Sequence, residues 1–84
     1  MSAIQEIAAE RQKQVAKGFT ADHDDEHDAG KLAWEAECVL VGIGDSWGIL
    51  RKHGNDKRRR YLIAAALIVA EIERMDRAKK AGAK

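Results

Sequence analysis

Acidic and imidazole side chains crowd one short segment of the chain, residues 21–28. The segment holds five carboxylates and two imidazoles and no apolar residue larger than alanine: Asp22, His23, Asp24, Asp25, Glu26, His27 and Asp28. Because like charges so close together repel one another, we expect a cation against this segment. This cation could be a metal ion, a basic partner, or the chain's own basic run at 57–60.

A metal ion would use the spacing of the two histidines. His23 and His27 are four residues apart, so one helical turn would place both on the same face, as a metal site requires. Mg²⁺, Mn²⁺ or Zn²⁺ could then bind with oxygen ligands from four carboxylates, namely Asp24, Asp25 and the E-x-x-D pair Glu73 and Asp76. Helical nucleotide pyrophosphohydrolases hold Mg²⁺ with paired E-x-x-E and E-x-x-D motifs, but this chain has no E-x-x-E. A metal-dependent enzyme is therefore an alternative, beside a plain solvated acidic loop.

The basic run gives residues 51–60 a net charge of +5, against −5 for residues 21–28. It stands on the first turn of the predicted last helix, where positive charge opposes the helix dipole. Its members are Lys57, Arg58, Arg59 and Arg60. Guanidinium groups match phosphate, and the flanking Trp47 and Tyr61 could stack on a base, so a nucleotide or phosphate site is one interpretation. The other is a network of ion pairs between the arginines and the acidic segment, which we predict.

Trp34 lies away from the apolar stripe of its predicted helix, which contains Leu32, Ala36 and Val39. An exposed tryptophan is typical of protein interfaces, although packing in the core is an equal alternative. If the cation is a basic partner, the binding residues would be Asp22, Asp24, Asp25, Glu26, Asp28 and Trp34.

The elements that position these groups are predicted to be helices in a single domain, residues 1–84. Proline is absent, aromatic residues make up 5%, and few stretches alternate in polarity. Capping signals and apolar spacing predict helices at 3–17, 29–41, 47–52 and from 55 or 56 to 79, followed by a frayed basic tail at 78–84. We therefore expect an all-α bundle of three main helices and one short helix, with the long C-terminal helix in the centre.

The last predicted helix is apolar on nearly every side between residues 61 and 70. Two short helices cannot cover all of this surface, so we expect a homodimer that buries part of Leu62, Leu67 and Val69. The apolar run is about half of the ~20 residues that a membrane span needs. With no signal-peptide pattern and a single cysteine, Cys38, in an apolar run, we expect a cytoplasmic protein without disulfides.

Two stretches resemble a family of small proteins encoded by bacteriophages and prophages. One is the pattern K-G-x-T-x-x-H-D-D-x-H at 17–27, preceded by Ala-Glu-Arg-Gln at 9–12, and the other is A-A-L-I-x-A-E-I-E-R-x-D-R at 65–77. Residues 41–55 depart from the family, whose members tend to carry a longer insert there. The resemblance implies a helical fold and a phage setting but supplies no mechanism. By analogy with other small phage proteins, it favours binding to host machinery such as a CRISPR complex.

The leading hypothesis from the sequence is a non-enzymatic inhibitor or adaptor that works in the host cytoplasm. Its partner would be a host protein or ribonucleoprotein complex with a basic surface, and we expect no cofactor, no membrane and no direct contact with nucleic acid. The alternative is a nucleotide-directed protein, either a metal-dependent hydrolase or a phosphate binder that uses Arg58, Arg59 and Arg60. A structural phage component is a third hypothesis.

Overall fold

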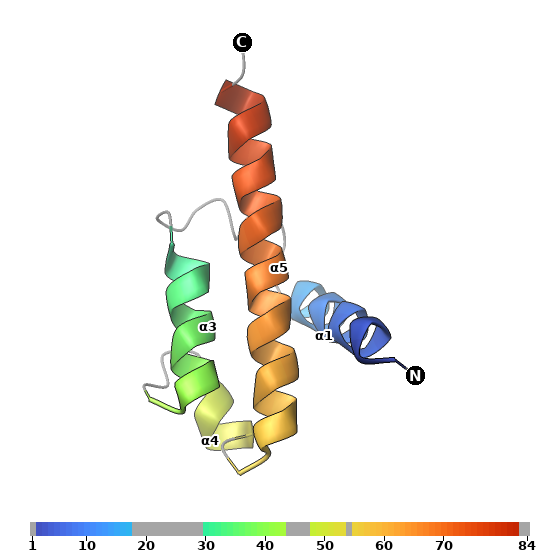
Figure 1. The fold of residues 1–84 in the computed structure, drawn as a ribbon, viewed down its shortest axis with the longest axis vertical. Helices are drawn as coiled ribbons and strands as arrows, with labels where there is room; N and C mark the ends of the chain where they lie inside the picture. Colours follow the sequence, from blue (N-terminus) through green and yellow to red (C-terminus); the bar gives the residue numbers. More distant parts are fainter. Residues whose placement is uncertain (1, 18–29, 44–47, 54, 83–84) are drawn as a thin grey trace.

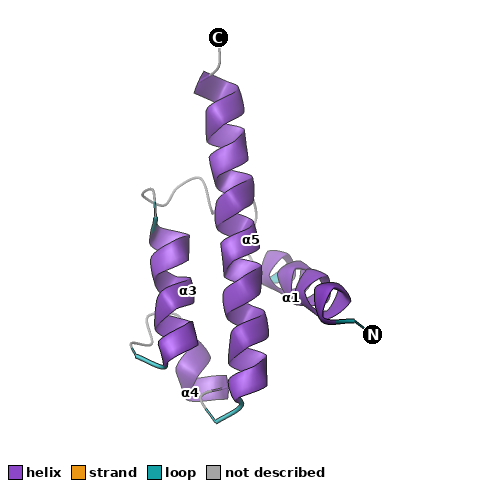
Figure 2. Ribbon diagram, in the orientation of Figure 1, coloured by secondary structure: helices purple, strands orange, loops and turns teal. Residues whose placement is uncertain are grey.

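Four helices form the regular structure of the chain in a computed structural model, which describes residues 2–17, 30–43, 48–53 and 55–82. They are α1 (Ala3–Ala16), α3 (Lys31–Val41), α4 (Ile49–His53) and α5 (Lys57–Gly82). No strand occurs within these ranges (Figure 2). The expected all-α bundle of three main helices and one short helix is therefore confirmed.

The long C-terminal helix α5 is the centre of the bundle, as expected. In Figure 1, α3 runs alongside α5, α1 crosses α5 steeply on another side, and α4 lies at the end where α5 begins. All three shorter helices pack against α5. The positions of side chains on α5 therefore decide which surfaces the other helices cover.

The start of α1 follows its sequence signal. The amide of Gln5 donates to Ser2 Oγ at 3.2 Å, and the amide of Ser2 donates to Gln5 Oε1 at 2.8 Å. This reciprocal pair is the predicted capping box, which satisfies two amides at the open end of the helix. The helix ends at Ala16 and Lys17 is its C-cap, one residue earlier than predicted.

The start of α3 depends on a contact from α5. Its first helical residue is Lys31, two residues later than predicted, and Gly30 precedes it with φ at 89°, in the left-handed region that favours glycine. The Gly30 amide donates to Glu71 Oε2 at 3.0 Å. The amphipathic pattern of the last helix predicts that Glu71 faces outward. This prediction was wrong, because Glu71 is buried where it caps the first turn of α3. The predicted cap, Asp28, lies outside the described residues.

The second half of the chain also departs slightly from its predicted bounds. Helix α4 spans Ile49–His53 rather than 47–52. Asp56 Oδ1 accepts a hydrogen bond from the Arg59 amide at 2.9 Å, so Asp56 caps α5, whose first residue is Lys57 rather than residue 55 or 56. Helix α5 continues to Gly82, through most of the tail that was expected to fray, because this stretch contains the helix-favouring residues alanine and lysine.

The core lies between α3 and α5. Its buried apolar side chains are 0–4% exposed and come from Leu32, Ala36, Val39, Ile63, Ala64, Ala66, Leu67 and Ala70. The side chain of Ile49 from α4 packs against them. The predicted apolar stripe of α3 is thus confirmed at Leu32, Ala36 and Val39, whereas Leu40, which the same spacing places on it, is exposed. Leu67, which we expected at a dimer interface, is instead part of this core.

The apolar spacing in the C-terminal half of α5 predicts that Ile72 and Met75 face inward, and this prediction was wrong. Ile72 and Met75 are about half exposed rather than buried. The C-terminal turns of α5 extend past the described parts of α1 and α3 in Figure 1, so no helix among the described residues covers that end of α5. The amphipathic pattern there is real, but its apolar side faces outward.

Helix α1 packs through its polar side. We expected Ile4, Ile7, Ala8, Arg11 and Val15 to form the buried face. Instead Ile4 is 79% exposed and Val15 is also exposed, whereas Glu10 and Gln14 are buried. The side of α5 that receives α1 carries arginines, so carboxylates and an amide are the groups that it can accommodate.

Candidate functional site

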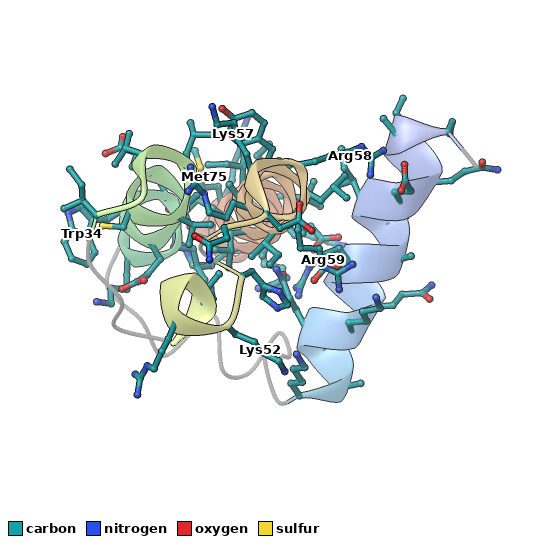
Figure 3. The ribbon with its side chains drawn as sticks, turned by 90° about the horizontal axis from the view of Figure 1, so that it is seen from below. Trp34, Lys52, Lys57, Arg58, Arg59 and Met75 are labelled. Carbon is teal, nitrogen blue, oxygen red and sulfur yellow. The ribbon has the colours of Figure 1, made fainter. Side chains whose placement is uncertain are left out.

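The basic run occupies the first turn of α5 and meets acidic residues from α1. The Arg58 guanidinium binds both oxygens of Glu6, with Nη1 3.0 Å from Oε1, and Arg59 Nη2 lies 3.2 Å from Glu10 Oε2. Figure 3 shows Arg58 and Arg59 both directed toward α1. The hydrogen bond from Arg58 lowers the pKa of Glu6 below its usual value. These carboxylates supply the anions that the helix dipole and the basic run require.

The predicted pairing of the arginines with the acidic segment stays a prediction. The acidic segment itself, Asp22, Asp24, Asp25, Glu26 and Asp28, lies outside the described residues. Arg60 Nη2 donates to the Leu40 carbonyl oxygen at 3.4 Å. A phosphate group at Arg58 and Arg59 would have to displace carboxylates, so the phosphate interpretation has little support at this place. Lys57 is exposed, and Tyr61 is partly exposed on another side of α5.

The residues of the metal alternative are not brought together in the part of the chain that the structure describes. Glu73 Oε1 accepts a hydrogen bond from Arg11 Nε at 3.2 Å, and Asp76 is exposed. His23, Asp24, Asp25 and His27 lie outside the described residues. Among residues 2–17, 30–43, 48–53 and 55–82, no group of three or more His, Cys, Asp or Glu side chains is placed to hold a metal ion.

Three buried glutamates were missed by the sequence analysis. Glu10 is held by Arg59 and, at 3.9 Å, by Lys13, and Glu71 is held by the Gly30 amide and by Arg74. Glu35 is 2% exposed, and Lys31 Nζ lies 3.4 Å from its Oε1, within ion-pair range but without hydrogen-bond geometry. The spacing 32, 35, 36, 39 would have placed Glu35 on the core face of α3, had polar residues been included in the pattern.

A cavity of about 180 Å³ lies between α1, α4 and α5. Its polar lining comes from Glu10, Gln14, Lys17, Lys52 and His53, and Lys52 reaches toward α1 in Figure 3. Burial lowers the pKa of His53 below its usual value, and the nearby charges of Arg59 and Lys52 add to this shift. The cavity is lined by a buried carboxylate and by cationic side chains. The charge of its lining therefore favours neither an anionic nor a cationic ligand.

Trp34 is half exposed on the outer side of α3, away from α5 (Figure 3). The ammonium group of Lys31 lies 4.9 Å from the centroid of the Trp34 ring. This cation–π contact holds the ring against its own helix. The alternative in which Trp34 packs in the core is thereby excluded. The Trp34 side chain is therefore accessible to a partner near the N-terminal end of α3, which follows the acidic segment in the sequence.

An apolar surface runs along α5 on the side that neither α1 nor α3 covers. We call it the α5 stripe: Tyr61, Ala65, Ile68, Ile72 and Met75. Its four large members are 39–54% exposed. Beside it, a groove of about 230 Å³ between α3 and α5 has Ala36, Ala64 and Ala65 among its lining residues, together with Leu40, Tyr61 and Ile68. The small alanine side chains leave room for side chains from another helix.

Comparisons with protein-family models, with curated proteins and with solved structures find no match to this chain. The expected phage family therefore stays a prediction. None of the described helices combines the length and the apolar composition that would let it cross a membrane.

Proposed function

We propose that this chain is a non-enzymatic binding protein whose partner contacts Trp34 and the acidic segment 22–28. The observation that supports the proposal is the half-exposed indole of Trp34 on the first turn of α3. A large aromatic side chain held in place and open to solvent is typical of an interface hot spot. Trp34 follows Asp28 by six residues, so the two parts of the proposed surface come from neighbouring stretches of the sequence.

The partner in this proposal is a host protein or ribonucleoprotein complex with a basic surface. The segment's charge of −5 would speed the encounter with such a surface, while Trp34 would supply buried area once the two are in contact. The resemblance to phage proteins extends the proposal to the host cytoplasm and to inhibition of a defence complex such as a CRISPR effector. The proposal also includes a homodimer.

The test measures binding of three variants to a partner captured from host lysate and then purified. We expect Trp34→Ala to weaken binding at least tenfold, and Asp24→Lys with Asp25→Lys to weaken it and to flatten its salt dependence. Val41→Ala is the matched control, because Val41 is an exposed apolar residue at the opposite end of the same helix. Calorimetry that finds wild-type affinity for both the Trp34 variant and the double variant would refute the proposal.

A further inference from the structure

The α5 stripe has the spacing of a helix that packs against another helix. Its members are separated by four, three, four and three residues, the apolar repeat of a coiled-coil seam. Tyr61, Ile68 and Met75 then occupy one core position of the repeat, and Ala65 and Ile72 occupy the other. At about 1.5 Å per residue the stripe is about 21 Å long. Such a repeat buries its residues only when a second helix lies along it.

No helix among the described residues covers this stripe. Buried positions such as Ile63, Leu67 and Ala70 lie on the opposite side of α5, where α1, α3 and α4 pack. In Figure 3, which looks along α5, Met75 points away from α4. Helix α5 therefore has an apolar face toward α3, a polar face toward α1, and this apolar stripe, which no described helix covers.

We propose that the stripe is the surface on which a second copy of this chain docks, with its α5 antiparallel to the first. The inference rests on the homodimer included in the proposed function and adds its surface and register. In an antiparallel seam, the two core positions of the repeat face each other. A register that pairs four of the five residues places Ala65 opposite Ile68 of the other copy, and Tyr61 opposite Ile72.

The sizes of the facing side chains support this register. The small Ala65 makes room for the branched Ile68, and the symmetry of the dimer repeats the pair on the other side of its axis. A parallel dimer would instead face Ala65 with Ala65 and leave a void there, which lowers packing density. The stripe is thus complementary to itself in one orientation only.

The charges at the two ends of the seam also favour the antiparallel register. The antiparallel register sets Asp76 opposite Lys57 of the other copy. Both side chains are exposed. The two copies would therefore form an opposite-charge contact at each end, which favours this register over one that brings the basic ends together.

The area of the contact predicts a weak dimer. The stripe with the neighbouring groove measures about 21 Å by the width of two helices, on the order of 400 Å² for each copy. Stable complexes bury about 800 Å² for each partner. We therefore expect dissociation in the micromolar range, so that both monomer and dimer are present at ordinary laboratory concentrations.

Sedimentation across a concentration series tests the surface. The wild-type chain should approach twice 9.3 kDa at high micromolar concentration, and Ile68→Glu should stay monomeric with unchanged helical circular dichroism. Ile4→Glu is the matched control, because Ile4 is exposed on α1, outside the stripe, and this variant should dimerise like the wild type. A monomeric wild-type chain, or a dimer that Ile68→Glu leaves intact, would overturn the proposal.

Disulfide trapping tests the register, in a Cys38→Ser background. An equal mixture of Tyr61→Cys and Ile72→Cys chains should form a mixed disulfide, since these positions face each other. Either variant alone should not, because its own two cysteines would be eleven residues out of register, about 16 Å along the seam. Self-disulfides of each variant without the mixed product would show a parallel dimer and overturn the register alone. Partner binding at Trp34 is measured separately, so failure of either proposal is distinguishable.

Discussion

Helix α5 holds α3 and α1 by two different kinds of contact. Against α3 it buries Leu67, Ile63 and Ala64 among apolar side chains from α3, all nearly inaccessible to water. Against α1 it uses two arginine–glutamate pairs, a third pair between Arg11 and Glu73, and a hydrogen bond from Gln14 Nε2 to the Ile63 carbonyl oxygen at 3.4 Å. One helix thus combines an apolar interface and a polar one on adjacent faces.

The difference between the two interfaces implies unequal stability. Full burial of one leucine-sized side chain is worth about 1.5–3 kcal/mol. An exposed ion pair contributes about 0.2–1 kcal/mol and weakens as salt rises. We therefore expect α3, α4 and α5 to form the stable part of the molecule and α1 to separate first. Local opening of this kind is common where few apolar contacts hold an element.

The largest expected effect comes from breaking the apolar interface. Leu67→Ala should lower the free energy of unfolding by about 2–5 kcal/mol, because it leaves a cavity between α3 and α5. Ile68→Ala, its neighbour on the exposed α5 stripe, is the control and should cost the monomer much less. Urea unfolding followed by circular dichroism at low protein concentration measures both. Equal losses for the two variants would contradict the assignment of Leu67 to the core.

A smaller effect is expected from the polar interface. Arg59→Ala removes the nearest cation from Glu10, whose side chain is only 8% exposed, and should cost about 1 kcal/mol, since Lys13 still lies 3.9 Å away. Molar salt should reduce the difference between variant and wild type. Arg58→Ala is the matched variant, and its loss should be smaller because the Arg58–Glu6 pair is more exposed. If Arg59→Ala lowered the free energy of unfolding as much as Leu67→Ala does, the expected difference in stability between the two interfaces would be wrong.

The smallest effect should appear as a change with pH near the polar interface. The pKa of His53 is lowered in the folded chain, chiefly by burial, so the unfolded chain binds a proton first as the pH falls below the usual value of 6.5. The free energy of unfolding should therefore be level above pH 6.5 and decline below it, until His53 is protonated in the folded chain as well.

Substitution of His53 isolates this contribution from other titrating groups. His53→Gln should be less sensitive than the wild type between about pH 7.5 and 5, measured by thermal unfolding. The Arg58–Glu6 pair changes the free energy of unfolding in a more acidic range of pH. Because the pKa of Glu6 is lowered below 4.5, its contribution is present above that value and is lost as the pH falls through the lowered pKa. Parallel pH profiles for the wild type and the His53 variant would contradict the role of His53 burial.

The elements of the fold were largely predictable because their signals are local. Ser2 with Gln5 marked the start of α1, and the spacing of Leu32, Ala36 and Val39 marked the buried face of α3. The packing of α1 was not predictable in the same way. Its exposed side carries Ile4, and only the arginines that come from α5 explain why Glu10 is buried instead.

The candidate site was predictable only in part, for a related reason. Exposure of Trp34 follows from its position off the stripe of α3, but the carboxylates that pair with Arg58 and Arg59 lie about fifty residues away in sequence. Charge totals pointed to the acidic segment as a further partner, and that pairing stays a prediction because the segment lies outside the described residues. Ile72 and Met75 show the same limit, because apolar spacing does not say whether a neighbouring helix is long enough to cover them.

The contacts of α1 also have a consequence for the order in which the chain folds. Glu6 and Arg58 are 52 residues apart, and Arg11 and Glu73 are 62 apart, whereas Leu40 and Arg60 are 20 apart where α3 meets the start of α5. Closing the longer loops costs more chain entropy, so we expect α3, α4 and α5 to assemble first. On the ribosome, α1 is made before α5, so it cannot form these contacts until the helix that receives it has been synthesised.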